Sequence, residues 1–106
     1  MKKKDIKILL VDDEQDILEI VGYNLSQEGY QIVKASNGKE AIAKAKKEHP
    51  QLIIMDVMMP EMDGMEACEN IRKIPELQDT IITFLTARSE DYSQVAGFDA
   101  GADEYI

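Results

Sequence analysis

Four polar residues stand directly after short apolar runs, where their side chains could come together in one site. An acidic pair, Asp12 and Asp13, follows one run, Asp56 follows another, and Thr86 follows a third. Three carboxylates in one crevice repel each other, and a hard divalent cation relieves that repulsion. A site with few oxygen ligands suits Mg²⁺, and a carboxylate beside Mg²⁺ can attack a phosphoryl group. This pattern therefore predicts a magnesium site capable of phosphoryl transfer.

Each of these residues also has a simpler explanation when it is considered alone. Asp13 could cap a following helix, with Glu14 and Asp16 favouring the helix dipole. Asp56 could be a polar end to a buried strand, and Thr86 alone indicates nothing. The joint arrangement favours a site, because separate explanations would require three coincidences at one edge of a sheet.

Short strands alternating with helices are the elements that must position these residues. Apolar residues recur at helical spacing between nearly continuous apolar runs, and such runs are typical of buried strands. Asn37 followed three residues later by Glu40, and Asp63 followed by Glu66, predict helix starts, and Gly29 predicts a helix end. The predicted strands cover residues 6–11, 30–35, 52–55, 81–85 and 102–106.

This alternation predicts a parallel sheet with helices on both faces, since strands and helices joined by right-handed crossovers leave few topologies. The flavodoxin-like strand order 2-1-3-4-5 is the natural choice, giving a three-layer α/β sandwich. In that order the first and third strands are neighbours, and their C-terminal ends flank the crevice where ligands bind. The whole chain, residues 1–106, is expected to form one domain.

The composition argues against several classes of protein. The net charge of −9 disfavours direct binding to nucleic acid, which requires a basic face. No apolar stretch approaches the roughly 18 residues that a spanning helix needs, and the run 6–11 is too short and polar for a secretion signal. We therefore expect a cytoplasmic protein without direct membrane contact. Cys68, the single cysteine, and the methionines near Asp56 are expected to pack against other side chains.

Four segments resemble the receiver domains of two-component response regulators. Together they span nearly the whole chain in the order and spacing of that family. The resemblance implies a signalling module that accepts a phosphoryl group and can dephosphorylate itself, rather than a turnover enzyme. The segments are 11–14 (Val-Asp-Asp-Glu), 55–64 (Met-Asp-Val-Met-Met-Pro-Glu-Met-Asp-Gly), 85–87 (Leu-Thr-Ala) and 101–106 (Gly-Ala-Asp-Glu-Tyr-Ile).

The resemblance also implies a role for each residue of the acidic site. Asp56 would accept the phosphoryl group from a sensor histidine kinase or a phosphotransfer protein. Asp13 and Asp56 would bind Mg²⁺ directly, together with the backbone carbonyl of Met58, and Asp12 would act through water.

Two further residues would report phosphorylation. By the same resemblance, Thr86 would hydrogen-bond a phosphoryl oxygen, and Tyr105 would swing inward when Thr86 moves. Pro60 and Gly64 would shape the loop after the acceptor, since Pro restricts φ and Gly permits positive φ.

The chain departs from the family at its C-terminus. Receivers carry a Lys-Pro pair after the fifth strand and then a last helix, whereas this sequence ends at Ile106. We therefore expect a C-terminally truncated receiver with impaired or short-lived switching. An apolar sheet face left open by the missing helix could also serve for association.

Three other functions compete with the receiver hypothesis. A calcium-binding loop with Gly64 as its glycine would place Met59 and Asn70 at ligand positions, and neither fits. A phosphatase with an aspartyl nucleophile would want a second acid where this chain has Met58. A pseudo-receiver, an interaction module that is never phosphorylated, remains open, and it would show neither metal dependence nor phosphoryl uptake.

Overall fold

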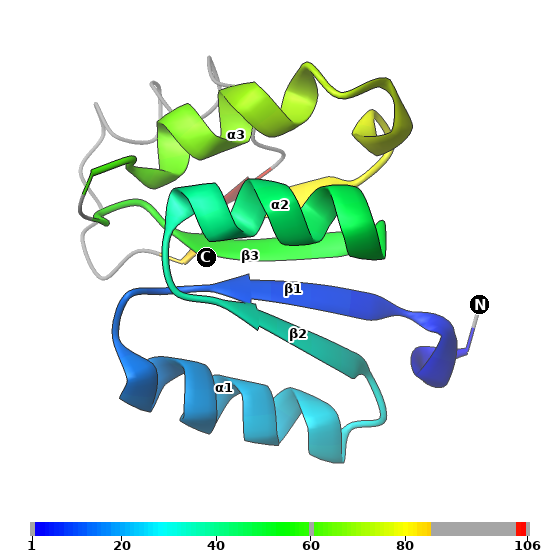
Figure 1. Cartoon of the computed structure of the whole chain (residues 1–106). Coiled ribbons are helices and arrows are strands. Elements are labelled where there is room, and N and C mark those ends of the chain that lie inside the picture. Colours follow the sequence, from blue (N-terminus) through cyan, green and yellow to red (C-terminus); the bar gives the residue numbers. More distant parts are fainter. Residues whose placement is uncertain (1, 60, 86–103, 106) are drawn as a thin grey trace.

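The computed structural model describes residues 2–59, 61–85 and 104–105, and in them strands alternate with helices (Figure 1). The strands are β1 (Lys7–Val11), β2 (Gln31–Ala35), β3 (Leu52–Asp56), β4 (Ile81–Leu85) and β5 (Glu104–Tyr105). The helices are α1 (Gln15–Gln27), α2 (Gly38–Glu48) and α3 (Gly64–Arg72), with short 3₁₀ turns η1 (Lys3–Asp5) and η2 (Pro75–Leu77).

The strands form one parallel sheet in the order β2-β1-β3-β4-β5, so β1 lies between β2 and β3. Val11 at the end of β1 lies opposite Ala35 of β2 and Met55 of β3. Helix α1 covers one face of the sheet, and α2 and α3 cover the other (Figure 1). The predicted flavodoxin-like α/β fold with a parallel sheet is confirmed.

Successive residues of the inner strands are buried on opposite faces, because side chains alternate along a strand. This explains why the strands read as continuous apolar runs rather than as alternating patterns. The cluster beneath α2 and α3 includes Leu9, Val11, Ala41, Ala45, Ile53, Met55, Cys68, Ile71, Ile82 and Phe84. The smaller cluster beneath α1 contains Ile8, Leu10, Leu18 and Ile54.

The predicted helix starts are confirmed by their capping bonds. The side-chain oxygen of Asn37 accepts a hydrogen bond from the backbone nitrogen of Glu40 at 2.8 Å. Asp63 caps α3 in the same way, accepting from the backbone nitrogen of Glu66 at 2.9 Å. Gly29 follows the end of α1 with φ at 107°, in the left-handed region where glycine is favoured.

The strand boundaries differ from the predicted ones by one residue at three places. β1 and β2 each begin one residue later than predicted, at Lys7 and Gln31. β3 extends to Asp56, which pairs in register with Leu85 of β4, so the acidic residue ends the strand instead of following it. Within the predicted strand 102–106, the described residues are those of β5, paired with β4.

No described helix is long and apolar enough to cross a lipid bilayer.

Two buried threonines before and within β4 should respond oppositely to substitution. The Thr83 hydroxyl has no hydrogen-bond partner in the described part of the chain, whereas the Thr80 hydroxyl donates to the Pro50 carbonyl at 2.9 Å. Thr83→Val should therefore raise the free energy of unfolding by about 1 kcal/mol, and Thr80→Val should lower it by about the same amount. Urea unfolding followed by circular dichroism measures both. Changes of the same sign in the two variants would contradict this difference in hydrogen bonding between the two hydroxyls.

Candidate functional site

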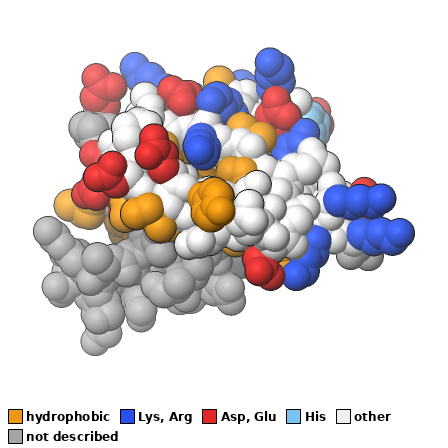
Figure 2. Space-filling view, turned by 90° about the horizontal axis from the view of Figure 1, so that it is seen from below, with side chains coloured by type: hydrophobic (Ala, Val, Ile, Leu, Met, Phe, Trp, Pro, Cys, Tyr) orange, Lys and Arg blue, Asp and Glu red, His pale blue; other side chains and the backbone are white. Residues whose placement is uncertain are grey.

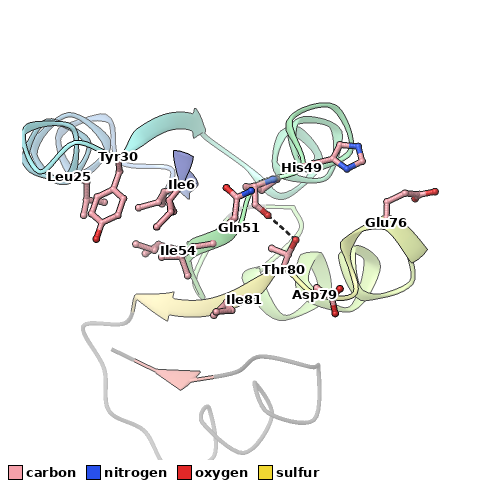
Figure 3. Close-up of a pocket in the computed structure, with 13 residues that line it drawn as sticks. Ile6, Leu25, Tyr30, His49, Gln51, Ile54, Glu76, Asp79, Thr80 and Ile81 are labelled. Atoms are coloured by element: carbon pink, nitrogen blue, oxygen red, sulfur yellow. Dashed lines mark hydrogen bonds between the residues drawn. The ribbon is translucent and has the colours of Figure 1, made fainter. Parts of the chain in front are cut away.

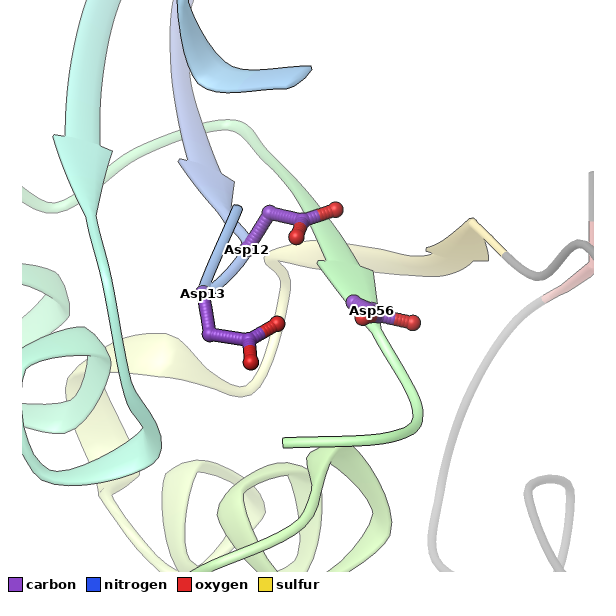
Figure 4. Close-up of side chains that lie close together, drawn as sticks. All are labelled: Asp12, Asp13 and Asp56. Carbon is purple, nitrogen blue, oxygen red and sulfur yellow. The ribbon is translucent and has the colours of Figure 1, made fainter. Parts of the chain in front are cut away.

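Three carboxylates converge at the C-terminal ends of β1 and β3 (Figure 4). Asp12 and Asp13 directly follow β1, and Asp56 is the last residue of β3. One oxygen atom from each of the three side chains lies within 4.8 Å of the others. The neighbouring positions of β1 and β3 bring together residues that are distant in sequence. The predicted convergence of the three aspartates is therefore observed.

The backbone holds Asp12 in place within this cluster. Its backbone nitrogen donates to the Ala35 carbonyl at 3.1 Å, and its Oδ1 accepts from the Glu14 nitrogen at 2.9 Å. Its side chain is buried, whereas Asp13 is exposed. The capping explanation for Asp13 is wrong, because Glu14 occupies the N-cap position of α1 and makes no side-chain capping bond.

The loop after Asp56 is anchored tightly against the end of β3. The Gly64 nitrogen donates to the Val57 carbonyl at 2.9 Å. A Cβ atom at Gly64 would lie 2.3 Å from the Asp56 carbonyl oxygen and 3.0 Å from a ring carbon of Phe84. Gly64 is therefore required by this close approach of α3 to the acidic residue. Oδ1 of Asp56 in turn accepts from the Met58 nitrogen at 3.3 Å.

Comparisons with known proteins bear directly on this arrangement. The sequence model of the response regulator receiver domain matches residues 8–106. The chain belongs to this family. It is a receiver domain of two-component signal transduction.

Its relatives include regulators and solved receiver structures. It is 45% identical over 100 residues to the alkaline phosphatase synthesis transcriptional regulatory protein PhoP of Bacillus subtilis. That match covers 94% of this chain but 41% of PhoP, so the receiver domain spans about two fifths of that relative.

Two solved structures cover 95% of this receiver domain, and the match covers 84% of each of their chains. Chemotaxis protein CheY4 of Vibrio cholerae is 35% identical with a TM-score of 0.92. The response regulator TrrA of Thermotoga maritima, solved in complex with Mg²⁺-BeF, is 40% identical with a TM-score of 0.84.

The acidic cluster of the receiver domain is electrostatically unfavourable by itself. Burial, followed by the charges of Asp12 and Asp13, raises the pKa of Asp56. The pKa of Asp12 is also raised, first by burial, although the hydrogen bond from the Glu14 nitrogen opposes this. Each shift means that the ionised form is penalised, so a cation among the three carboxylates would be stabilising.

The donor set of this cluster fits a magnesium ion. All three residues offer carboxylate oxygens, which are ligands suited to a hard divalent cation. Asp12, Asp13 and Asp56 could therefore hold the ion, and the backbone carbonyl of Met58 belongs to the loop that directly follows Asp56.

The remaining predicted site residues are described only in part. Thr86 and Pro60 lie outside the described residues. The backbone of Tyr105 belongs to β5 and pairs with Phe84 of β4, but its side chain lies outside the described part of the chain. The predicted roles of Thr86 and Tyr105 stay predictions.

Most of the methionines near the site pack as predicted. Met55 and Met59 are buried, and Met62 and Met65 pack against the larger core cluster. Met58 is the exception, because its side chain is 60% exposed beside Asp56. The packing of Cys68, which is fully buried, is confirmed.

Sequence reasoning missed one contact of the loop. A Cβ atom at Gly38, the first residue of α2, would lie 2.9 Å from both Cγ and Sδ of Met62. Gly38 thus leaves room for Met62 to cover the start of α2. A glycine directly after the N-cap Asn37 was the sequence signal that could have indicated such a contact.

Replacing Gly64 with alanine should distort the site, because the new methyl group would clash with the Asp56 carbonyl, which is backbone and cannot move aside. We expect Gly64→Ala to lower the free energy of unfolding by about 2–3 kcal/mol. Gly22→Ala is the matched control, since the nearest atom to its Cβ would be in the flexible end of Lys34, at 2.9 Å, and Ile32 would lie at an ordinary contact distance of 3.7 Å. This control should change stability by no more than about 1 kcal/mol. Equal losses in urea unfolding would contradict the proposed clash.

Removing one carboxylate should stabilise the metal-free receiver domain at neutral pH. Because the pKa values of Asp12 and Asp56 are raised above the unfolded value of 3.8, the folded state holds these protons more tightly. The stability that Asp12 and Asp56 contribute by holding these protons is fully present below the unfolded pKa. It is lost as the pH rises through their folded pKa values. Asp12→Asn, which keeps the oxygen that accepts from Glu14, should therefore unfold at higher urea than the parent chain at pH 7 in chelator.

The same comparison has a pH and a metal control. The difference between parent chain and Asp12→Asn should shrink below pH 3.8, where the carboxyl groups are protonated in both states. Addition of Mg²⁺ should stabilise the parent chain more than the variant, because the acidic site of the parent chain should bind the ion more tightly than the same site with Asn at position 12. Asp16→Asn, an exposed change in the first turn of α1, should show none of these effects. A parent chain that gains stability between pH 4 and 7 relative to Asp12→Asn would be inconsistent with the raised pKa values.

Proposed function

We propose that this receiver domain accepts a phosphoryl group on Asp56 and thereby passes a signal from a sensor histidine kinase or a phosphotransfer protein. The observation that carries the proposal is the convergence of three carboxylate oxygens within 4.8 Å at the ends of two neighbouring strands. One aspartate of the three, Asp56, stands at the end of β3 with a raised pKa and the exposed Met58 side chain two residues away. The relatives that share this sequence pattern are response regulators.

The proposed reaction is a transfer between a histidine and an aspartate. A carboxylate oxygen of Asp56 attacks the phosphorus atom of a phosphohistidine, forming a P–O bond as the P–N bond breaks. The electron pair of the P–N bond stays on the imidazole nitrogen, and the product is an acyl phosphate on Asp56. When bound, Mg²⁺ would supply positive charge that neutralises the transferring phosphoryl oxygens. Asp12, Asp13 and Asp56 would hold the ion, Asp12 through water, and the Met58 carbonyl would be a further ligand.

Positioning by the backbone supports this reaction. Asp56 accepts from the Met58 nitrogen, and the close approach of Gly64 to the Asp56 carbonyl limits movement of the acceptor. A fixed nucleophile next to a neutralising charge is most of what phosphoryl transfer requires. The carboxylate must be ionised to attack, so a bound cation also opposes the effects that raise the pKa of Asp56.

The proposed signal is a shift between two surface conformations. Thr86, which follows β4, hydrogen-bonds a phosphoryl oxygen, and Tyr105 of β5 changes position in response. The pairing of Tyr105 with Phe84 supports this route, because it places β5 next to the strand that leads into Thr86. The phosphoryl group shifts the equilibrium only as far as it interacts differently with the two conformations.

The receiver domain is proposed to act on a partner or an output domain rather than to turn over a substrate. PhoP, which this chain matches over 41% of its length, is described as a transcriptional regulator. By analogy we propose regulation of a downstream response in which this acidic chain does not itself contact nucleic acid. The expected cytoplasmic location stays a prediction.

Intact mass after incubation with acetyl phosphate tests the proposal. We expect one added phosphoryl group in the presence of Mg²⁺, with no addition in chelator and none to Asp56→Asn, because the variant lacks the nucleophilic carboxylate. Asp16→Asn, which removes an exposed acid outside the cluster, should be phosphorylated like the parent chain. A folded parent chain that takes no phosphoryl group would favour the pseudo-receiver alternative, and equal uptake by Asp56→Asn would show that the acceptor is a different residue.

A further inference from the structure

The loop between β3 and α3, residues 57–63, is attached to the fold by apolar side chains near both of its ends. Val57 and Met59 are buried near its start, and Met62 packs against the larger core cluster near its end. Between these contacts the Met58 side chain is 60% exposed. The backbone of Met58 therefore lies in a segment whose position depends on the contacts on either side of it.

The backbone turns at Glu61 into a conformation that this residue type disfavours. Its φ is 67°, in the left-handed region where a Cβ atom crowds the following carbonyl oxygen. Such a conformation persists only where neighbouring contacts hold it. The next residue, Met62, makes a close contact of this kind, because a Cβ atom at Gly38 would lie 2.9 Å from its Cγ and Sδ and 3.0 Å from its Cβ. Gly38 has no positive φ, so this contact explains why the position has no side chain.

The charges of the loop oppose a close approach to the acidic cluster. Glu61 and Asp63 are exposed on the loop, and the three carboxylates of the cluster lie at the same edge of the sheet. Figure 2 shows acidic side chains gathered on the left, at the end of the molecule toward which the strand arrows of Figure 1 point. Because like charges repel each other, packing contacts must hold the loop beside Asp56.

We propose that Met62, packed against Gly38, is the positioning residue that holds the Met58 backbone beside Asp56 for the binding of Mg²⁺. This inference rests on the proposed function, in which the Met58 carbonyl is a ligand of the ion. The Met58 nitrogen donates to Oδ1 of Asp56 at 3.3 Å, which is long for such a bond. A bond of this length resists displacement weakly, so the packing of Met62 fixes the far end of the loop.

The other end of β3 is fixed independently of this loop. Figure 3 shows the hydrogen bond that the Thr80 hydroxyl donates there to the Pro50 carbonyl, at 2.9 Å. The side chain of Gln51, in the same view, accepts from the Lys7 nitrogen at 2.6 Å. Loss of the Met62 contact should therefore loosen the loop without shifting the strand. Thr80→Val is a matched control, because it destabilises the fold at the opposite edge of the sheet.

Calorimetric titration with Mg²⁺ tests the proposal, together with hydrogen exchange of the Met58 amide measured by NMR in chelator. Met62→Ala should weaken Mg²⁺ binding at least about tenfold, as loss of a support for a metal ligand typically does, and should speed exchange of the amide. Met62→Leu keeps an apolar side chain of similar volume, so its affinity should stay within about threefold of the parent chain. Thr80→Val should leave the affinity and the exchange unchanged. Circular dichroism establishes that each variant is folded.

Gly38→Ala isolates the contact from other effects of Met62. The new methyl group would displace Met62, so this change alone should also weaken Mg²⁺ binding. Added to Met62→Ala, where the space is free, it should cause no further loss, because the two changes remove one contact.

Several results would overturn the role of Met62. These are a folded Met62→Ala chain that is unchanged in either measurement, losses of affinity that are equal in Met62→Ala and Thr80→Val, and a parent chain that binds no Mg²⁺. Failure of the proposed function is distinguishable from these results. In that case the parent chain and the variants bind Mg²⁺ as expected, yet acetyl phosphate adds no phosphoryl group to the parent chain.

Discussion

The pairing of β1 with β3 is the interaction on which the rest of the structure depends. The chain connects β1 to β2 through α1, and β2 to β3 through α2, yet β3 returns to lie on the free side of β1. This return creates a reversal of strand order, and ligand sites in open α/β sheets lie where the order reverses. The register of Val11 with Met55 then brings the next residues of each strand, Asp12 and Asp56, to the same edge. Any other neighbour for β1 would separate the carboxylates.

The acidic site lowers the stability of the metal-free fold and at the same time favours the binding of a cation. Its carboxylates are partly buried and close together, which raises the pKa values of Asp12 and Asp56. The surrounding backbone opposes their separation: Glu14 and Met58 donate to the two side chains, and Gly64 packs against the end of β3. Because the cluster is rigid, a cation can relieve the repulsion among its carboxylates without reorganising the fold.

Much of this arrangement could be predicted from sequence, because the relevant signals are local. Continuous apolar runs indicated strands buried on both faces, and the Asn37–Glu40 and Asp63–Glu66 pairs indicated helix starts. Strand order followed from general rules of crossover connection. The acidic cluster then followed, since residues after parallel strands share an edge.

The parts that sequence reasoning missed depend on three-dimensional contacts. Asp13 has the residue type of a cap, but the chain enters α1 one residue later, at Glu14. Met58 has the residue type of a packed side chain, yet the loop turns it outward because Val57 and Met59 occupy the interior.

The contacts of Gly64 and Gly38 differ in stiffness, and this difference has a mechanical consequence. The loop after Asp56 touches α3 through backbone, at Gly64, and touches α2 through the thioether of Met62, at Gly38. Backbone atoms cannot turn aside, whereas a flexible methionine side chain can change rotamer. The start of α3 is therefore coupled to the end of β3 more stiffly than Met62 couples the same loop to the start of α2.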